Sequence, residues 1–200
     1  TYSVSLREVS DSGCIGNDTF VISVKPQLTA RISASGPLIF CENGSVNLVA
    51  SVSGVGNSLN YQWLNNNNAI PGANSSNYVA TQSGTYTLEL LSNNLCRDTS
   101  NSQTVLVYPK PQGVLSSTNG SLLLCAGNPL ELNVSGINIS NYQWYFTDAN
   151  NSSGPIRVGN NSAVYNATNP GYYSVELTTS TTPACKAYAI DTLNVKLRQK

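Results

Sequence analysis

Five cysteines are the residues of this sequence best suited to chemistry: Cys14, Cys41, Cys96, Cys125 and Cys185. Cysteine side chains either form disulfides or bind zinc as thiolates. Zinc is disfavoured, because no two cysteines are close in sequence and the chain contains no histidine. Disulfides are the favoured interpretation, with buried free thiols as the alternative. Disulfides in turn predict an oxidising, extracellular location such as the cell surface.

The other reactive side chains do not form a catalytic set. Without histidine, the sequence has no Ser-His-Asp triad and no Cys-His dyad. Glu89 and Glu176 stand at equivalent places in two repeats, and one glutamate per repeat does not supply the facing carboxylates of a glycosidase. Neither an aspartate-rich calcium loop nor a glycine-rich phosphate loop is present. We therefore predict no enzyme activity, no cofactor and no metal.

Charge and hydropathy restrict the partners that this chain could bind. The formal net charge is +0 at pH 7, which gives no electrostatic reason to expect nucleic acid. No apolar run approaches the roughly 18 residues that a membrane span requires. We therefore predict neither nucleic-acid binding nor membrane insertion.

The elements that position the cysteines repeat along the chain with a period of about 85 residues. Residues 60–63, Asn-Tyr-Gln-Trp, return as residues 141–144, and the spacing of residues 78–86 returns in residues 165–173. Short proline-containing joins, such as the one at residues 108–111, separate the repeats and favour stiff connections. The predicted domains are the last strands of a truncated repeat at 1–26, a domain at 27–110 and a domain at 111–200.

Within each repeat, apolar residues alternate with polar ones, as in strands with one buried face. No segment has a helical period, so the predicted class is all-β. About seven short strands, a tryptophan on the third and a tyrosine opening the sixth resemble an immunoglobulin-like β-sandwich. Trp63 and Trp144 are predicted to fill the core, and Tyr86 and Tyr173 to form tyrosine corners. The alternative is that these aromatic side chains are ligand platforms.

The cysteine positions differ from those of antibody domains. Cys41 and Cys125 precede the second strand of their repeats, whereas Cys96 and Cys185 follow the sixth, toward the opposite end of such a sandwich. A disulfide therefore requires a loop that folds back, or a bond that reaches a neighbouring domain. Counting favours the pairs Cys41–Cys96 and Cys125–Cys185, because only Cys14 is then left unpaired in this fragment.

Residues 40–48, 61–65, 84–88 and Cys96, with their counterparts in the second repeat, resemble a known group of bacterial proteins. The group comprises the immunoglobulin-like and PKD-like tandem repeats of large Bacteroidota surface proteins, which include gliding-motility adhesins. The resemblance implies secretion by the type IX pathway. It also implies O-glycosylation of threonine in the Asp-Thr pairs, at Thr19, Thr99 and Thr192.

The favoured function is a structural repeat segment of an extracellular bacterial stalk, filament or adhesin, which spaces and presents other parts. Its partners are then neighbouring repeats of the same chain, with self-assembly into a filament or surface glycans as further partners. One alternative is a glycan-binding module in which Tyr145, Tyr165 or Tyr188 stacks on sugar rings. The other is an accessory domain of a secreted polysaccharide hydrolase.

Overall fold

The structure is a computed structural model that describes residues 2–7, 15–21, 27–54, 58–92, 96–150 and 154–198. All regular secondary structure in these ranges is β-strand, so the all-β prediction is confirmed. Two compact units are present: residues 1–33, 49–78 and 86–102 form the first, and residues 34–48, 79–85 and 103–200 form the second. Cys14 and the join at Lys25-Pro26 lie outside the described residues.

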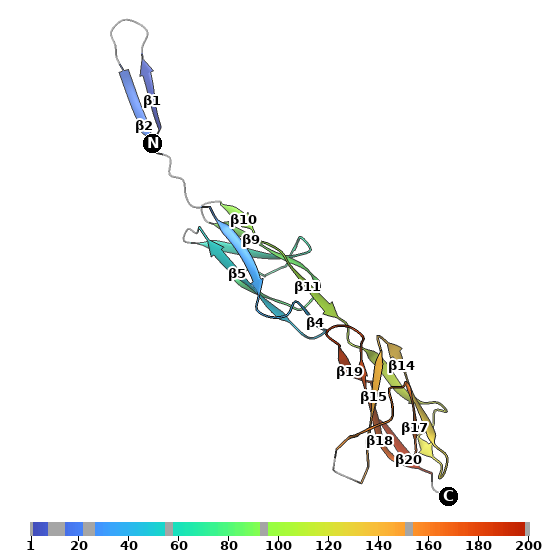
Figure 1. Cartoon of the computed structure of the whole chain (residues 1–200). Coiled ribbons are helices and arrows are strands. Elements are labelled where there is room, and N and C mark those ends of the chain that lie inside the picture. The colour runs from blue at the N-terminus through green and yellow to red at the C-terminus, as the bar shows by residue number, and fades with distance from the viewer. Residues whose placement is uncertain are drawn as a thin grey trace. The chain divides into compact units, whose positions relative to one another are not determined.

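The first described residues form one antiparallel hairpin. It pairs β1 (Tyr2–Arg7) with β2 (Ile15–Phe20), and the register places Val4 opposite Asp18. The label β2 in Figure 1 marks the second of these two strands. Its Asp18-Thr19 pair belongs to the strand, and the Thr19 side chain is exposed.

Repeat 1, as we name residues 27–110, places its strands in two sheets. One sheet has the order β3-β5-β8, and the other has the order β4-β11-β9-β6-β7 with β10 on β9. The strands are β3 (Thr29–Ala34), β4 (Ile39–Cys41), β5 (Val46–Ser53), β6 (Leu59–Asn65), β7 (Asn68–Ala69), β8 (Asn77–Ala80), β9 (Gly84–Ser92), β10 (Arg97–Thr99) and β11 (Gln103–Tyr108).

Repeat 2, residues 111–200, has the same strand order. Its sheets are β12-β14-β17 and β13-β20-β18-β15-β16, with β19 on β18 (Figure 1). The strands are β12 (Gln112–Ser117), β13 (Leu123–Leu124), β14 (Leu130–Ile137), β15 (Asn141–Thr147), β16 (Ile156–Val158), β17 (Val164–Ala167), β18 (Gly171–Thr178), β19 (Lys186–Tyr188) and β20 (Leu193–Leu197).

Both sheets of repeat 2 contribute side chains to a single core, which makes this repeat a β-sandwich. Leu132 comes from the smaller sheet, and Trp144 and Val175 come from the larger one. The alternation seen in the sequence produces this arrangement, because successive side chains of a strand point to opposite faces. Every second residue of β18 is buried, beginning with Gly171.

A glycine opens the equivalent strand in each repeat, and the backbone explains why. Gly84 has a φ of 155° and Gly171 a φ of 150°, a region that residues with a side chain rarely adopt. A Cβ atom at Gly171 would lie 2.6 Å from the Thr147 carbonyl oxygen. The glycine therefore lets β18 begin close against β15.

Candidate functional site

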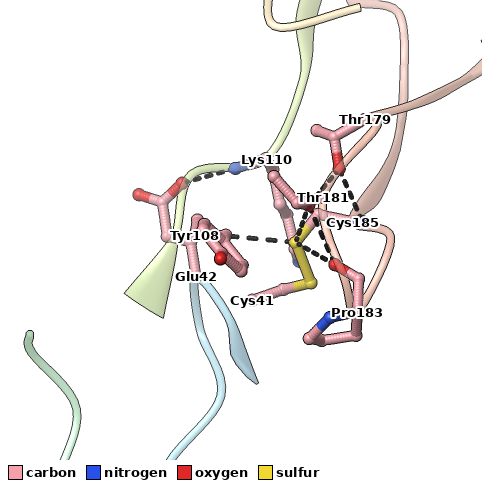
Figure 2. The surroundings of a disulfide bond; sticks show 8 residues. All are labelled: Cys41, Glu42, Tyr108, Lys110, Thr179, Thr181, Pro183 and Cys185. Atoms are coloured by element: carbon pink, nitrogen blue, oxygen red, sulfur yellow. Dashed lines mark hydrogen bonds between the residues drawn. A yellow bond between two sulfur atoms is a disulfide. The ribbon is translucent and has the colours of Figure 1, made fainter. Parts of the chain in front are cut away.

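The candidate site is a disulfide that joins the two repeats. Cys41 of repeat 1 is bonded to Cys185 of repeat 2, with a Cα–Cα separation of 5.6 Å and a sequence separation of 144 residues. Figure 2 shows the bond and the residues around it. Both cysteines belong to the second compact unit.

Strand pairing fixes the position of Cys41. The short strand β4 runs parallel to β11, the last strand of repeat 1, and Cys41 lies opposite Tyr108. The Glu42 N–H then donates to the Tyr108 carbonyl at 2.8 Å, and the Gly44 N–H donates to the Cys41 carbonyl at 2.9 Å. Cys41 is therefore held where the chain leaves repeat 1, between a strand and a tight turn.

A set of hydrogen bonds within the loop positions Cys185. The Cys185 N–H donates to Thr179 Oγ1 at 2.9 Å, and Thr179 Oγ1 lies 2.6 Å from Thr181 Oγ1. Thr181 in turn donates to the Pro183 carbonyl at 2.8 Å (Figure 2). Each hydroxyl can thus accept from one neighbour and donate to the next. The fully buried Cys185 is presented by a loop whose polar groups are satisfied internally.

This bond corrects the predicted pairs Cys41–Cys96 and Cys125–Cys185. Within repeat 2, Cys125 follows β13, which pairs with the end of β20, and β20 in turn pairs with the start of β18. Cys185 instead follows the end of β18. Eight residues of extended strand separate these two ends, about 26 Å at roughly 3.3 Å per residue. A disulfide needs about 4.4–6.8 Å between Cα atoms, so pairing within the repeat is excluded.

The remaining described cysteines occupy positions equivalent to the bonded pair. Cys96 follows β9 as Cys185 follows β18: the Ser92 N–H donates to the Cys96 carbonyl and the Thr179 N–H to the Cys185 carbonyl, both at 2.9 Å. Cys125 follows β13 as Cys41 ends β4. Cys125 is an exposed thiol, outside any disulfide.

The tryptophans and tyrosines singled out in the sequence are core side chains. Trp63 and Trp144 are 0% exposed, and Tyr86 and Tyr173 are 1% exposed. The indole N–H of Trp144 donates to the Ser162 carbonyl, and the Tyr173 hydroxyl donates to the Asn169 carbonyl. Burial raises the pKa of Tyr173 to about 12.

The sequence interpretation assigned no role to the glutamine between the paired aromatic residues. Gln62 Nε2 donates to the carbonyls of Trp63 and Ile70, and Gln143 Nε2 donates to those of Trp144 and Val158. Each glutamine therefore connects its strand, β6 or β15, to the segment that follows that strand. Its repetition in both Asn-Tyr-Gln-Trp strings was the available signal.

The Asp-Thr pairs are less regular in structure than in sequence. Asp98-Thr99 lies within β10, where Thr99 pairs with Glu89, whereas Asp191-Thr192 lies in the loop before β20. The residue opposite Glu176 in repeat 2 is Tyr188. Thr99 and Thr192 are both exposed, but they are not equivalent positions of the fold.

Two surface features lie away from the disulfide. A recess of about 360 Å³ in repeat 1 is lined by β6, β9 and β10, and includes Thr99. On repeat 2, the rings of Tyr145 and Tyr188 lie 6.1 Å apart, and Tyr188 is 60% exposed. Tyr165 instead stacks on Trp144, with 5.4 Å between ring centroids. Of the three proposed sugar platforms, Tyr165 is thus packed against the core.

The described ranges contain no metal-binding cluster and no membrane-spanning helix. Within them, no three His, Cys, Asp or Glu side chains gather closely enough to hold an ion. None of the described segments forms a helix with the length and apolar character needed to cross a bilayer.

Comparisons with known proteins reveal similarity in fold. No protein-family model matches the sequence, and no curated protein matches it significantly. A crystal structure of the N-terminal eight Ig domains of Down syndrome cell adhesion molecule (DSCAM) aligns with 99% of this chain, at a TM-score of 0.51 and 15% identity. The aligned part is 28% of that structure. Four Ig domains of Dscam1 align with 95% of this chain, at a TM-score of 0.40, 12% identity and 52% of that structure.

Murine CEACAM1b aligns with 84% of this chain over its whole length, at a TM-score of 0.38 and 15% identity. Together with the strand order, the DSCAM similarity shows that the chain consists of immunoglobulin-like β-sandwich repeats. Identity this low carries information on fold and not on role.

Proposed function

We propose that this chain is a structural segment of an extracellular stalk, filament or adhesin, whose repeats space and present other parts of a larger protein. The observation that supports this role is the Cys41–Cys185 bond, which connects consecutive repeats by a second covalent path. A disulfide between repeats adds nothing to ligand recognition within either one, but it does resist their separation under load.

The bond also supports an extracellular location. Disulfides persist in oxidising compartments and are rare in the cytosol. The sequence resemblance extends the proposal to a large surface protein of Bacteroidota, exported by the type IX pathway and glycosylated at Thr19, Thr99 and Thr192. The exposed threonine side chains are compatible with that modification. The proposal assigns the chain no catalytic role.

The test is binding of the purified chain to a broad panel of glycans and polysaccharides. A structural segment is expected to show no saturable binding to any member. Saturable binding that is lost in one surface-tyrosine variant would replace this proposal with a lectin-like function.

The second candidate function is glycan binding at the Tyr145–Tyr188 pair. An exposed aromatic ring of this kind offers a face on which a sugar could stack, and Tyr188 is the more exposed of the two. Tyr188→Ala is the discriminating variant, and Tyr165→Phe is the control that leaves this surface unchanged. The second candidate requires binding that Tyr188→Ala abolishes and Tyr165→Phe retains.

A further inference from the structure

We propose that Cys125 forms a disulfide with the late cysteine of a further immunoglobulin-like repeat that follows repeat 2, as Cys41 does with Cys185. The late cysteine is the one that follows β9 in repeat 1 and β18 in repeat 2. The inference rests on the proposed function, because it requires this chain to be part of a longer array. It names the partner of an exposed thiol that the Cys41–Cys185 bond leaves unused.

The backbone around Cys125 reproduces the backbone around Cys41. The parallel pair of Leu124 with Leu197 corresponds to the pair of Phe40 with Val107. One step earlier, the Lys196 N–H donates to the Leu122 carbonyl, and the Leu106 N–H donates to the Leu38 carbonyl, both at 2.9 Å. Cys41 therefore ends a short strand beside the last strand of its repeat, and Cys125 directly follows the equivalent strand.

The turns after the two cysteines also agree. The Asn128 N–H donates to the Cys125 carbonyl at 3.1 Å, and the Gly44 N–H donates to the Cys41 carbonyl at 2.9 Å. The preceding residues, Gly127 and Asn43, both have positive φ, 81° and 69°. Cys125 is thus held in the conformation that allows Cys41 to form its bond.

The surface beside Cys125 has room for a partner. A cavity of about 180 Å³ opens there, lined by residues 124–129 together with Thr168, Pro170 and Leu197. Most of these side chains are small or apolar, which suits a compact loop with a proline and a cysteine. The Thr179–Cys185 loop that reaches Cys41 is a loop of that kind (Figure 2).

The described cysteines of this chain do not supply the partner in cis. Cys185 is bonded to Cys41, and it lies about 26 Å from Cys125 along β18. A late cysteine in a following repeat instead stands at the end where that repeat begins. Repeat 2 shows this arrangement. The Ile190 N–H, five residues after Cys185, donates to the carbonyl of Gly113, which is the third residue of the repeat.

Bond formation is a two-electron oxidation. The thiols of Cys125 and of the late cysteine each lose a proton and together lose two electrons, and one S–S bond forms. A small disulfide such as oxidised glutathione, or a disulfide oxidoreductase, accepts the electrons and is reduced to two thiols.

The test extends the full chain with a second copy of residues 111–200 placed directly after Lys200. Lys200 lies two residues after Arg198, as Lys110 lies two residues after the equivalent Tyr108. The junction therefore reproduces the native Lys110-Pro111 join. Asn160→Gln in the appended copy marks its Cys185 peptide by mass. The protein is oxidised with oxidised glutathione, alkylated and digested without reduction. The Cys41–Cys185 link is read from the same digest, since that link reports correct folding.

The expected result is a peptide of the first Cys125 linked to the marked Cys185 peptide, with loss of alkylation at the first Cys125. The Cys125 of the appended copy has no following repeat and is expected to remain alkylated. Cys125→Ser in the extended chain is expected to restore alkylation of the marked Cys185. Full alkylation of the first Cys125 in a digest that contains the Cys41–Cys185 link would overturn the inference, as would a Cys125–Cys125 link between two molecules. Glycan binding by the chain would contradict the proposed structural function, but it would not alter which cysteines are linked in this experiment.

Discussion

The Cys41–Cys185 bond makes a quantitative prediction for the chain under tension. When the chain is pulled from its two ends, the residues between the bonded cysteines cannot extend while the bond is intact. The sequence separation is 144 residues. At roughly 3.3–3.6 Å per extended residue, and with the 5.6 Å Cα–Cα separation subtracted, the bond withholds about 470–510 Å of contour length.

The assay is single-molecule stretching of the full chain in the absence and presence of reductant. Oxidised molecules are expected to reach a final contour about 470–510 Å shorter than reduced molecules. Cys185→Ser is expected to show the long contour in both conditions. Cys125→Ser is the matched control, because it removes a thiol and should keep the short contour under oxidising conditions.

Two results would refute this reasoning. Equal contours for oxidised protein and Cys185→Ser would show that the inter-repeat bond does not form. A hidden length of about 175–190 Å would correspond to the sequence separation of 55 between Cys41 and Cys96, and would restore pairing within repeat 1.

Three further predictions concern the stability of repeat 2. Trp144→Ala should lower its free energy of unfolding by about 3–5 kcal/mol in a denaturant titration, because the indole is fully buried and hydrogen-bonded; a loss below about 1 kcal/mol would contradict the core assignment. The pKa of Tyr173 is about 12 in the folded protein against 10.0 ordinarily, so the unfolded chain loses this proton first as the pH rises. Stability should therefore be full below about pH 10 and fall by roughly 2–3 kcal/mol toward pH 12, a dependence that Tyr173→Phe should lack in pH-resolved urea titrations. Gly171→Ala should destabilise by about 1–3 kcal/mol, through its φ of 150° and the contact with the Thr147 carbonyl. Gly36→Ala, where a Cβ meets nothing within 4 Å, should be close to neutral in thermal unfolding.

The fold was predictable from the sequence because the alternation of apolar and polar residues indicates the strands of each repeat independently. Alternation over residues 130–134 and 173–177 predicts inward rows, and both rows contribute to the core of repeat 2. The spacing from Tyr78 to Tyr86 recurs from Tyr165 to Tyr173, and in each repeat these two rings are in contact. Such local and repeated constraints are visible in sequence.

The disulfide was harder to predict because its determinant is the direction of strands. Sequence counting treats Cys125 and Cys185 as a pair, whereas the register of β13, β20 and β18 places them at opposite ends of one sandwich. The Asp-Thr pairs show a related limit. Each pair follows its late cysteine in sequence, but the pairs do not occupy equivalent positions of the fold. Thr99 lies opposite Glu89, whereas the residue opposite the equivalent Glu176 is Tyr188.

In an array built on the proposed Cys125 bond, the disulfide loops overlap. The first loop ends at Cys185, and the second begins earlier in the chain, at Cys125, so every residue of repeat 2 lies inside at least one closed loop. The shortest covalent path along the array then alternates one such bond with a backbone segment that runs from a late cysteine to the early cysteine of the next repeat. In this chain that segment corresponds to the 29-residue separation of Cys96 from Cys125, and it is crossed once for every two repeats. Fully extended, that segment adds about 95–105 Å for every two repeats, against about 560–610 Å for two periods of about 85 residues without these bonds. Pairing between neighbours thus limits extension along the entire array, whereas pairing within each repeat would leave every join dependent on a single backbone.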